Sequence, residues 1–158
     1  MNYPPGSVIH AERPIYDWNM IRYFDREEFE CKCGGAYCND TLPPVAEAHY
    51  FHLAWYFLDP LRKDVGSKAV ISSAYRCPRH NANEGGRKRS YHTIPDNARS
   101  QHPSAVDFYF PHIHYHVAEI DVMRHTGNAC LNGYHLYINP EGLYFFHIDF
   151  RNYRARWK

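Results

Sequence analysis

The features that would direct a protein to a membrane or a nucleic acid are missing from this sequence. Its 18 basic and 17 acidic side chains leave a formal net charge of +1, so no strong field favours DNA, RNA or an anionic membrane. No apolar run approaches the roughly 20 residues that span a bilayer, and the N-terminus has neither a basic head nor an apolar stretch of the signal-peptide type. We therefore expect no nucleic-acid or membrane partner, and synthesis in the cytoplasm without a signal peptide.

The sequence also lacks the even, widely spaced cysteine set of a secreted disulfide framework. It has five cysteines: Cys31, Cys33 and Cys38 in CKCGGAYC, and Cys77 and Cys130 downstream. The odd, crowded set indicates a reducing compartment during synthesis. The three crowded cysteines, together with Cys77, would also suit a structural zinc, although buried thiols or one disulfide are the more ordinary explanation.

The pattern of apolar residues predicts one domain of the α+β class, with no internal repeat or low-complexity tract. At 158 residues the chain is long enough for a single substantial core. We expect residues 1–30 to form an arm or lead-in and residues 31–158 to form the domain. The expected elements are a helix over 45–66 ended by Gly66, strands over 69–76 and 105–110, a second helix over 114–127, and a hairpin of 133–138 with 143–150. A long loop is expected over 81–104, and long loops inside compact domains are usually functional.

Two polar residues stand inside apolar strand segments. Asp107 lies in AVDF and His147 in YFFHIDF. A buried carboxylate needs a counter-charge or hydrogen bonds, and a metal ion is an efficient counter-charge. Catalytic zinc sites use three ligands drawn from His, Asp, Glu and Cys.

The runs SSAYRCPRHNANEGGRKRSYHT, SAVDF and FFHIDFR occur in this order in the chain. Together they resemble the signature of the zinc D-alanyl-D-alanine carboxypeptidases and related cross-peptide endopeptidases, which share a fold with the hedgehog signalling domain. Several spaced motifs in order are more specific than any one of them. The resemblance implies a central, mainly antiparallel sheet with flanking helices and long loops.

The resemblance also implies a set of zinc ligands and substrate contacts. The ligands would be Asp107, His147 and one histidine of the loop. We prefer His92 to His102 because an insertion in a surface loop costs little closure entropy, whereas His102 stands too close to Asp107. The family arginine that holds a substrate carboxylate corresponds to Arg76, supported by Ser73 and Tyr75; a structural salt bridge is the alternative role for Arg76.

The general base is where this sequence departs from the family pattern. Many members have an acid three positions before the last histidine, and here that residue is Tyr144. Glu141, six positions before His147, is the first candidate for the base. Asp149 could serve as the base or as a partner of His147, and the phenol of Tyr144 could donate to the oxyanion.

These features predict a zinc metallopeptidase of D,D or L,D type that acts on peptidoglycan stem peptides or cross-links. The similarity to compact phage-type members implies a role in lysis or wall penetration, at the bacterial wall or as part of a virion with tail assembly contacts. The alternative is a catalytically inactive zinc-binding structural or binding protein of the same fold. The residue at Tyr144 and the irregular ligand loop favour that alternative.

Overall fold

The chain begins with a small hairpin and two short 3₁₀ helices. The computed structural model describes residues 7–10, 13–39, 42–94, 104–129, 131–151 and 155–156. Strands β1 (Ser7–His10) and β2 (Arg13–Tyr16) pair antiparallel, and the 3₁₀ helices η1 (Trp18–Met20) and η2 (Arg26–Phe29) follow. A capping box between Asp25 and Glu28 fixes the start of η2.

One long helical run follows this lead-in. It consists of α1 (Pro44–Leu53), a π-helical turn η3 (Ala54–Leu58) and α2 (Asp59–Val65). Pro60 has no amide hydrogen, which explains why the regular α-helical bonding changes just before it. Gly66 ends the run at φ +68°, as the sequence predicted. Neither this run nor any other described helix is long and apolar enough to cross a membrane.

Five strands form the main sheet in the order β3-β4-β6-β5-β7. They are β3 (Val70–Ser73), β4 (Ala105–Tyr109), β5 (Gly133–Ile138), β6 (Tyr144–Asp149) and β7 (Ala155–Arg156). Every neighbouring pair is antiparallel except β5 and β7. The predicted β5–β6 hairpin is present, and Gly142 in its turn has φ +80°. Helices with a mainly antiparallel sheet confirm the α+β class.

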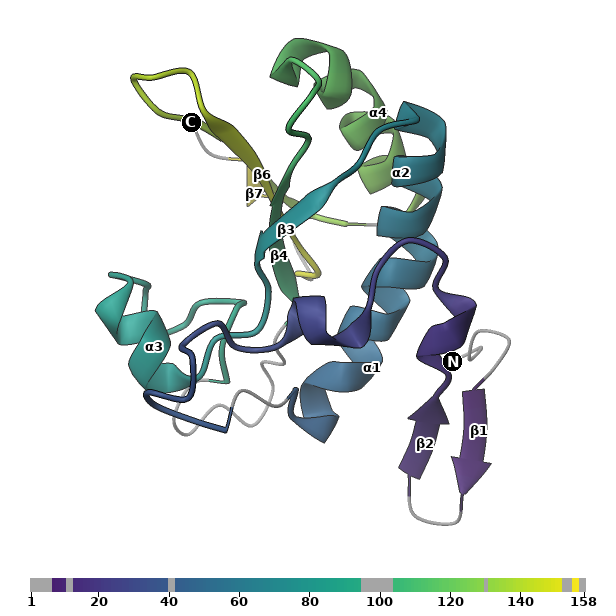
Figure 1. Ribbon diagram of the computed structural model, residues 1–158, viewed down its shortest axis with the longest axis vertical. Coiled ribbons are helices and arrows are strands. Elements are labelled where there is room, and N and C mark those ends of the chain that lie inside the picture. The colour runs from purple at the N-terminus through teal and green to yellow at the C-terminus, as the bar shows by residue number, and fades with distance from the viewer. Residues whose placement is uncertain are drawn as a thin grey trace.

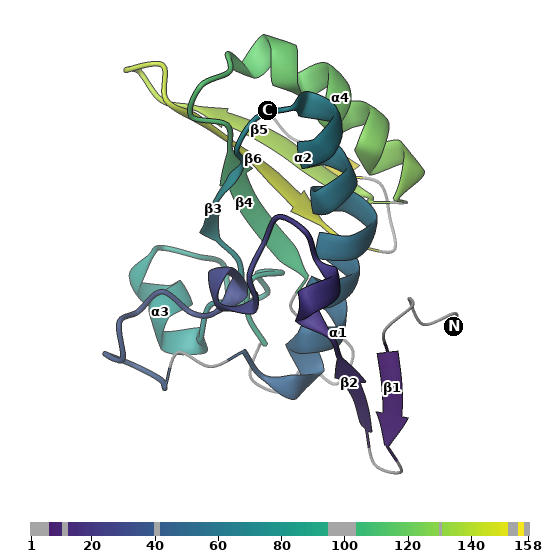
Figure 2. The same ribbon diagram turned by 45° about the vertical axis from the view of Figure 1, so that its right-hand side comes forward.

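The two faces of this sheet differ in character. Val106 and Phe108 of β4 and Phe146 of β6 are fully buried on one face, where the ring of Phe57 lies 5.9 Å from that of Phe108. Helices α2 and α4 (Tyr115–Asn128) lie on this side of the sheet (Figures 1 and 2). Because side chains alternate along a strand, the residues between these apolar ones point to the opposite face.

The lead-in packs against the rest of the chain. Tyr16, Ile21, Phe24 and Phe29 belong to the same buried cluster as the helices and the sheet. The indole nitrogen of Trp18 also donates to Glu47 of α1 at 3.1 Å. From Tyr16 onward, the segment predicted as an arm or lead-in therefore contributes to the core.

A short helix overlaps the start of the segment predicted as a long loop, residues 81–104. Helix α3 (Pro78–Asn83) begins with Pro78 in its first turn, a position that suits proline because the missing amide hydrogen has no helical partner there. Gly85 follows at φ +69°. Residues 95–103 of the expected loop lie outside the described residues.

Candidate metal centre

The register of β4 and β6 places Asp107 directly opposite His147. Both residues project from the face of the sheet opposite the helices. The carboxylate oxygen Oδ1 of Asp107 lies 2.7 Å from Nδ1 of His147. Asp107 is 6% exposed and His147 is 9% exposed, so this contact is almost fully shielded from water.

His92 reaches the same position from the loop after α3. The backbone N–H of Arg76 donates to the carbonyl of His92 at 2.7 Å, which ties this loop to the end of β3. The ring of His92 is buried, and its Nδ1 lies 2.7 Å from the carbonyl oxygen of Ala74. This carbonyl can only accept, so Nδ1 carries the proton and Nε2 is the nitrogen that faces Asp107 and His147.

The three side chains fit the ligand set of a zinc ion. Nε2 of His92 lies 3.3 Å from Nδ1 of His147 and 3.3 Å from Oδ2 of Asp107. Ligand atoms about 2.0–2.2 Å from zinc in a tetrahedron are about 3.3–3.5 Å from one another. Two imidazole nitrogens and a carboxylate, all within 4.8 Å of one another, are also the chemical types that zinc accepts while a position stays open for water.

A second pair of residues orients His147. Nε2 of His147 lies 3.1 Å from Oδ2 of Asp149, and the carboxylate of Asp149 is fully buried. Nε of Arg151 donates to Oδ1 of Asp149 at 2.6 Å, and its NH2 group contacts Oδ2. A carboxylate behind a metal-binding histidine fixes the ring and its tautomer. The structure thus places Asp149 as a partner of His147.

The same contacts shift the pKa values of these groups. Burial raises the pKa of Asp107, but the adjacent His92 and His147 outweigh it and hold that pKa well below its ordinary value. Burial lowers the pKa of His147, but its hydrogen bonds with Asp107 and Asp149 raise it to about 9. Without a metal, the two carboxylates on either side of His147 favour its protonated form. A divalent ion would take the place of its proton at Nδ1.

The predicted substrate residues lie beside this set. Arg76 NH2 lies 3.1 Å from Oδ2 of Asp107, and its Nε donates to the hydroxyl of Ser73 at 2.7 Å. Arg76 thus makes a structural salt bridge, the role that the sequence left as the alternative to substrate binding. Its partner in this salt bridge is Asp107, a candidate metal ligand. Tyr75 is buried. Burial, with the nearby sulfurs of Cys77 and Cys31, raises the pKa of Tyr75 to about 12.

Other predicted site residues are not brought to the metal ligands. Glu141 is exposed in the turn of the β5–β6 hairpin, beyond the last strand pair, Ile138 with Tyr144. Tyr144 lies on the face of β6 opposite His147, where its hydroxyl donates to the carbonyls of Phe110 at 2.9 Å and Ile113 at 2.6 Å. That position turns the phenol away from any oxyanion at the metal. His102 lies outside the described residues.

The sequence analysis missed His135, which lies directly opposite His147 in the β5–β6 ladder. Asp107, His147 and His135 therefore form a row across three neighbouring strands on one face. His135 is 7% exposed, and the ring of Tyr137 lies 4.1 Å from its own. The predicted hairpin, with its turn over 139–142, pairs 138 with 143 and so puts 135 opposite 146, whereas the observed register pairs 138 with 144 and 135 with 147.

Comparison with known proteins identifies the family of this chain. The family model described as peptidase M15 matches residues 22–136, more than half of the chain. The buried His-Asp-His set offers the ligand types of a zinc site. This chain belongs to the peptidase M15 family, whose members are metallopeptidases, usually with zinc. The match confirms the resemblance to the zinc D-alanyl-D-alanine peptidases. No curated protein and no solved structure matches the chain significantly.

Proposed function

We propose that this protein is a zinc peptidase that hydrolyses peptide bonds of peptidoglycan stem peptides or cross-links, in phage lysis or wall penetration. One observation carries the proposal: His92, Asp107 and His147 bring two ring nitrogens and a carboxylate within 4.8 Å of one another at one buried place, a ligand set that zinc accepts. Zinc bound there would polarise the scissile carbonyl and lower the pKa of its water to about 7. Family membership supports the same reaction class.

Arg76 is the residue best placed to orient the substrate. A guanidinium has five N–H donors, and among the described residues its contacts with Ser73 and Asp107 use those on Nε and NH2. The remaining donors suit the two oxygens of a peptide carboxylate. Since Arg76 contacts a metal ligand, a carboxylate bound to it would lie next to the hydrolytic position.

His135 is our candidate for proton transfer. It shares the face and the register position of His147, and a neutral imidazole can accept a proton from water and pass it to the leaving amine. The stacked rings of Tyr137 and Phe145, 4.5 Å apart, continue the same face toward the hairpin turn. Tyr137 is 39% exposed, so this pair offers an apolar surface to the substrate beside the site.

The test is the release of new amino groups from purified peptidoglycan, measured together with zinc content. We expect the wild type to hold zinc at this site and to release amino groups, and His147→Ala to lose that zinc and the activity. His112→Ala is the matched control, because His112 is exposed in the turn before α4, and it should behave like the wild type. Equal activity of His147→Ala and the wild type would contradict the proposal.

A second candidate function is a zinc-binding structural or binding protein that hydrolyses nothing, for example a virion component. The placement of two carboxylates favours it: Glu141 lies in the distant turn, and Asp149 is fully buried against Arg151. This candidate predicts a wild type that binds zinc but leaves peptidoglycan intact, while a known hydrolase cuts the same preparation.

A further inference from the structure

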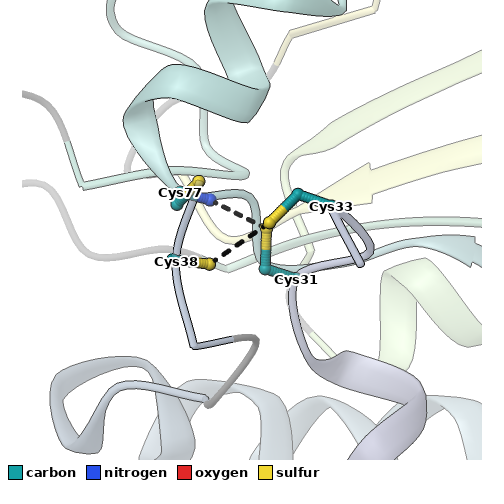
Figure 3. Close-up of side chains that lie close together, drawn as sticks. All are labelled: Cys31, Cys33, Cys38 and Cys77. Carbon is teal, nitrogen blue, oxygen red and sulfur yellow. Dashed lines mark hydrogen bonds between the residues drawn. The ribbon is translucent and has the colours of Figure 1, made fainter. Parts of the chain in front are cut away.

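Four cysteines from distant parts of the chain meet at a second place in the structure. Figure 3 shows Cys31, Cys33, Cys38 and Cys77 gathered between the lead-in and the start of α3. Their sulfur atoms all lie within 4.8 Å of one another. Cys31 and Cys77 are buried, whereas Cys33 and Cys38 are partly exposed. The metal ligands His92, Asp107 and His147 form a separate group.

Local backbone conformation explains how the first three cysteines converge. Gly34 and Gly35 follow Cys33 with φ +62° and +77°, a region that glycine adopts without strain. The N–H of Ala36 donates to the carbonyl of Cys33 at 3.2 Å and closes this turn. The chain therefore reverses between Cys33 and Cys38, and their sulfurs come to lie 3.5 Å apart.

Cys77 is brought to the same place by α3. It is the residue before Pro78, the first residue of the helix, and its sulfur accepts from the backbone N–H of His80 at 3.4 Å. The N–H of Cys77 in turn donates to the sulfur of Cys31 at 3.3 Å. The ring Nδ1 of His80 also lies 3.3 Å from that sulfur.

Burial raises the pKa of the Cys31 thiol to about 11, against the backbone hydrogen bonds that lower it, so a bound cation is what would hold this sulfur as a thiolate. Backbone N–H groups directed at sulfur stabilise a thiolate more than a neutral thiol, because a charged acceptor makes the stronger hydrogen bond. In a zinc site with Zn–S distances of about 2.3 Å, the sulfurs of a tetrahedron lie about 3.8 Å apart. The distance of 3.5 Å between Cys33 and Cys38 is close to that value and far from the roughly 2.05 Å of a disulfide.

We propose that Cys31, Cys33, Cys38 and Cys77 hold a structural Zn²⁺ ion as a four-thiolate site. Four protein ligands complete a tetrahedron and leave no position for water, so this ion would stabilise the fold and take no part in hydrolysis. The proposal goes beyond the proposed function and does not depend on it.

Such an ion would fasten the lead-in to the active-site end of the sheet. Cys77 is adjacent to Arg76, which contacts Asp107. The backbone N–H of Tyr75, the next residue before Arg76, donates to the carbonyl of Phe29 in η2 at 3.1 Å. A metal link between Cys31 and Cys77 would hold these two segments together and thereby keep Arg76 in place.

Cobalt spectroscopy of the wild type tests this site without any substitution. Reduced, metal-free protein is loaded with Co²⁺, because cobalt bound to several thiolates has a strong sulfur-to-metal charge-transfer band that a His-Asp-His site lacks. We expect this band in the wild type and also in His147→Ala, and we expect added Zn²⁺ to remove it. Saturation with cobalt without the band would overturn the proposal.

Zinc content then shows which side chains are involved. Cys38→Ser should lose one equivalent of zinc and the charge-transfer band, and partly exposed Cys38 is a mild place for this change. Cys130→Ser is the matched control and should keep both; Cys130 lies outside the described residues. Full zinc content in Cys38→Ser, or a disulfide between Cys33 and Cys38 in wild-type protein purified without a reductant, would overturn the proposal. These two readouts, zinc content and the cobalt spectrum, do not require peptidase activity. An inactive protein could therefore still confirm or contradict the four-cysteine site.

Discussion

Asp107 and His147 are directly opposite each other in antiparallel strands, and Oδ1 of one lies 2.7 Å from Nδ1 of the other. The sheet itself therefore fixes two of the three candidate metal ligands. Ladder hydrogen bonds on both sides of β6 hold its backbone, and rigid strands position a site more accurately than loops do. Only His92 comes from a loop, and the loop is bonded to Arg76 beside it.

Asp149→Asn should weaken zinc binding while leaving the three ligands in place. The amide keeps the size of the carboxylate but removes the charge that favours His147 as a ligand. Loss of such a partner typically lowers metal affinity or activity about 10–100-fold. Competition with a zinc chelator would measure the change. Asp121→Asn, on the surface of α4, is the control, and similar affinities in the two variants would exclude an orienting role for Asp149.

Gly133→Ala should disturb the same carboxylate through packing. A Cβ at Gly133 would lie 2.1 Å from Oδ1 of Asp149, and Arg151 and His147 already hold that group. We expect a loss of about 1–3 kcal/mol in the free energy of unfolding, together with weaker zinc binding. Chemical denaturation measures the first effect and chelator competition the second.

Gly127→Ala is the matched glycine control for this prediction. Gly127 lies in α4, and a Cβ there meets nothing within 4 Å. Alanine is about 0.5–1 kcal/mol more favourable than glycine inside a helix, so this variant should be slightly more stable than the wild type. If Gly133→Ala were as stable as the wild type, the close packing of Asp149 on β5 would be wrong.

Local sequence patterns predicted the main helices and strands, but they did not predict the β1–β2 hairpin, α3 or β7, nor all of the site. Alternation in FFHIDF indicates that His147 and Asp149 share a face, and the same rule puts Tyr144 on the other one, three residues away. Tyr144 and Glu141 were candidates because they lie three and six positions before His147, where members of the family pattern can have an acid. In the structure, however, Tyr144 is on the opposite face of β6 and Glu141 is in the hairpin turn. His135 could be found only by pairing the two strands of the hairpin residue by residue.

Contacts between distant segments were out of reach of such patterns. The sequence offered Cys77 as a partner of the cysteines in CKCGGAYC, but nothing local shows that Cys77, which lies 46 residues after Cys31, packs against them. The choice of His92 over His102 rested on loop length, whereas the bond from the N–H of Arg76 to the carbonyl of His92 is a contact between segments that loop length does not predict. Residues far apart in the sequence meet only in the packed fold. Closing the chain between them has an entropic cost, and tertiary contacts have to offset it.

The stability of the metal-free protein should depend on pH in a defined direction. The pKa of His147 is raised from 6.5 to about 9, so its contribution to stability is complete below about pH 6.5 and is lost as the pH rises through about 9. The pKa values of Asp107 and Asp149 are lowered from 3.8, so their contribution is present above about pH 4 and is lost as the pH falls further. The melting temperature in a chelator should therefore be highest between about pH 4 and 6.5.

Thermal unfolding of His147→Gln in the same buffers provides the comparison. Without the titrating imidazole, the fall in melting temperature between about pH 6.5 and 9 should become smaller. An identical fall in both proteins would show that another group causes it.

His135→Gln should separate proton transfer from metal binding. His135 shares a face with His147 but does not belong to the group of three candidate metal ligands. The His135→Gln variant should therefore still bind zinc at that group. If His135 moves the proton, kcat should fall about 10²–10⁴-fold with little change in KM, and the pH dependence of kcat should lose the limb that belongs to the imidazole. His116→Gln, at an exposed position of α4, should keep wild-type kinetics. If His135→Gln retains both zinc and kcat, another group carries the proton, and the proposed role of His135 is wrong.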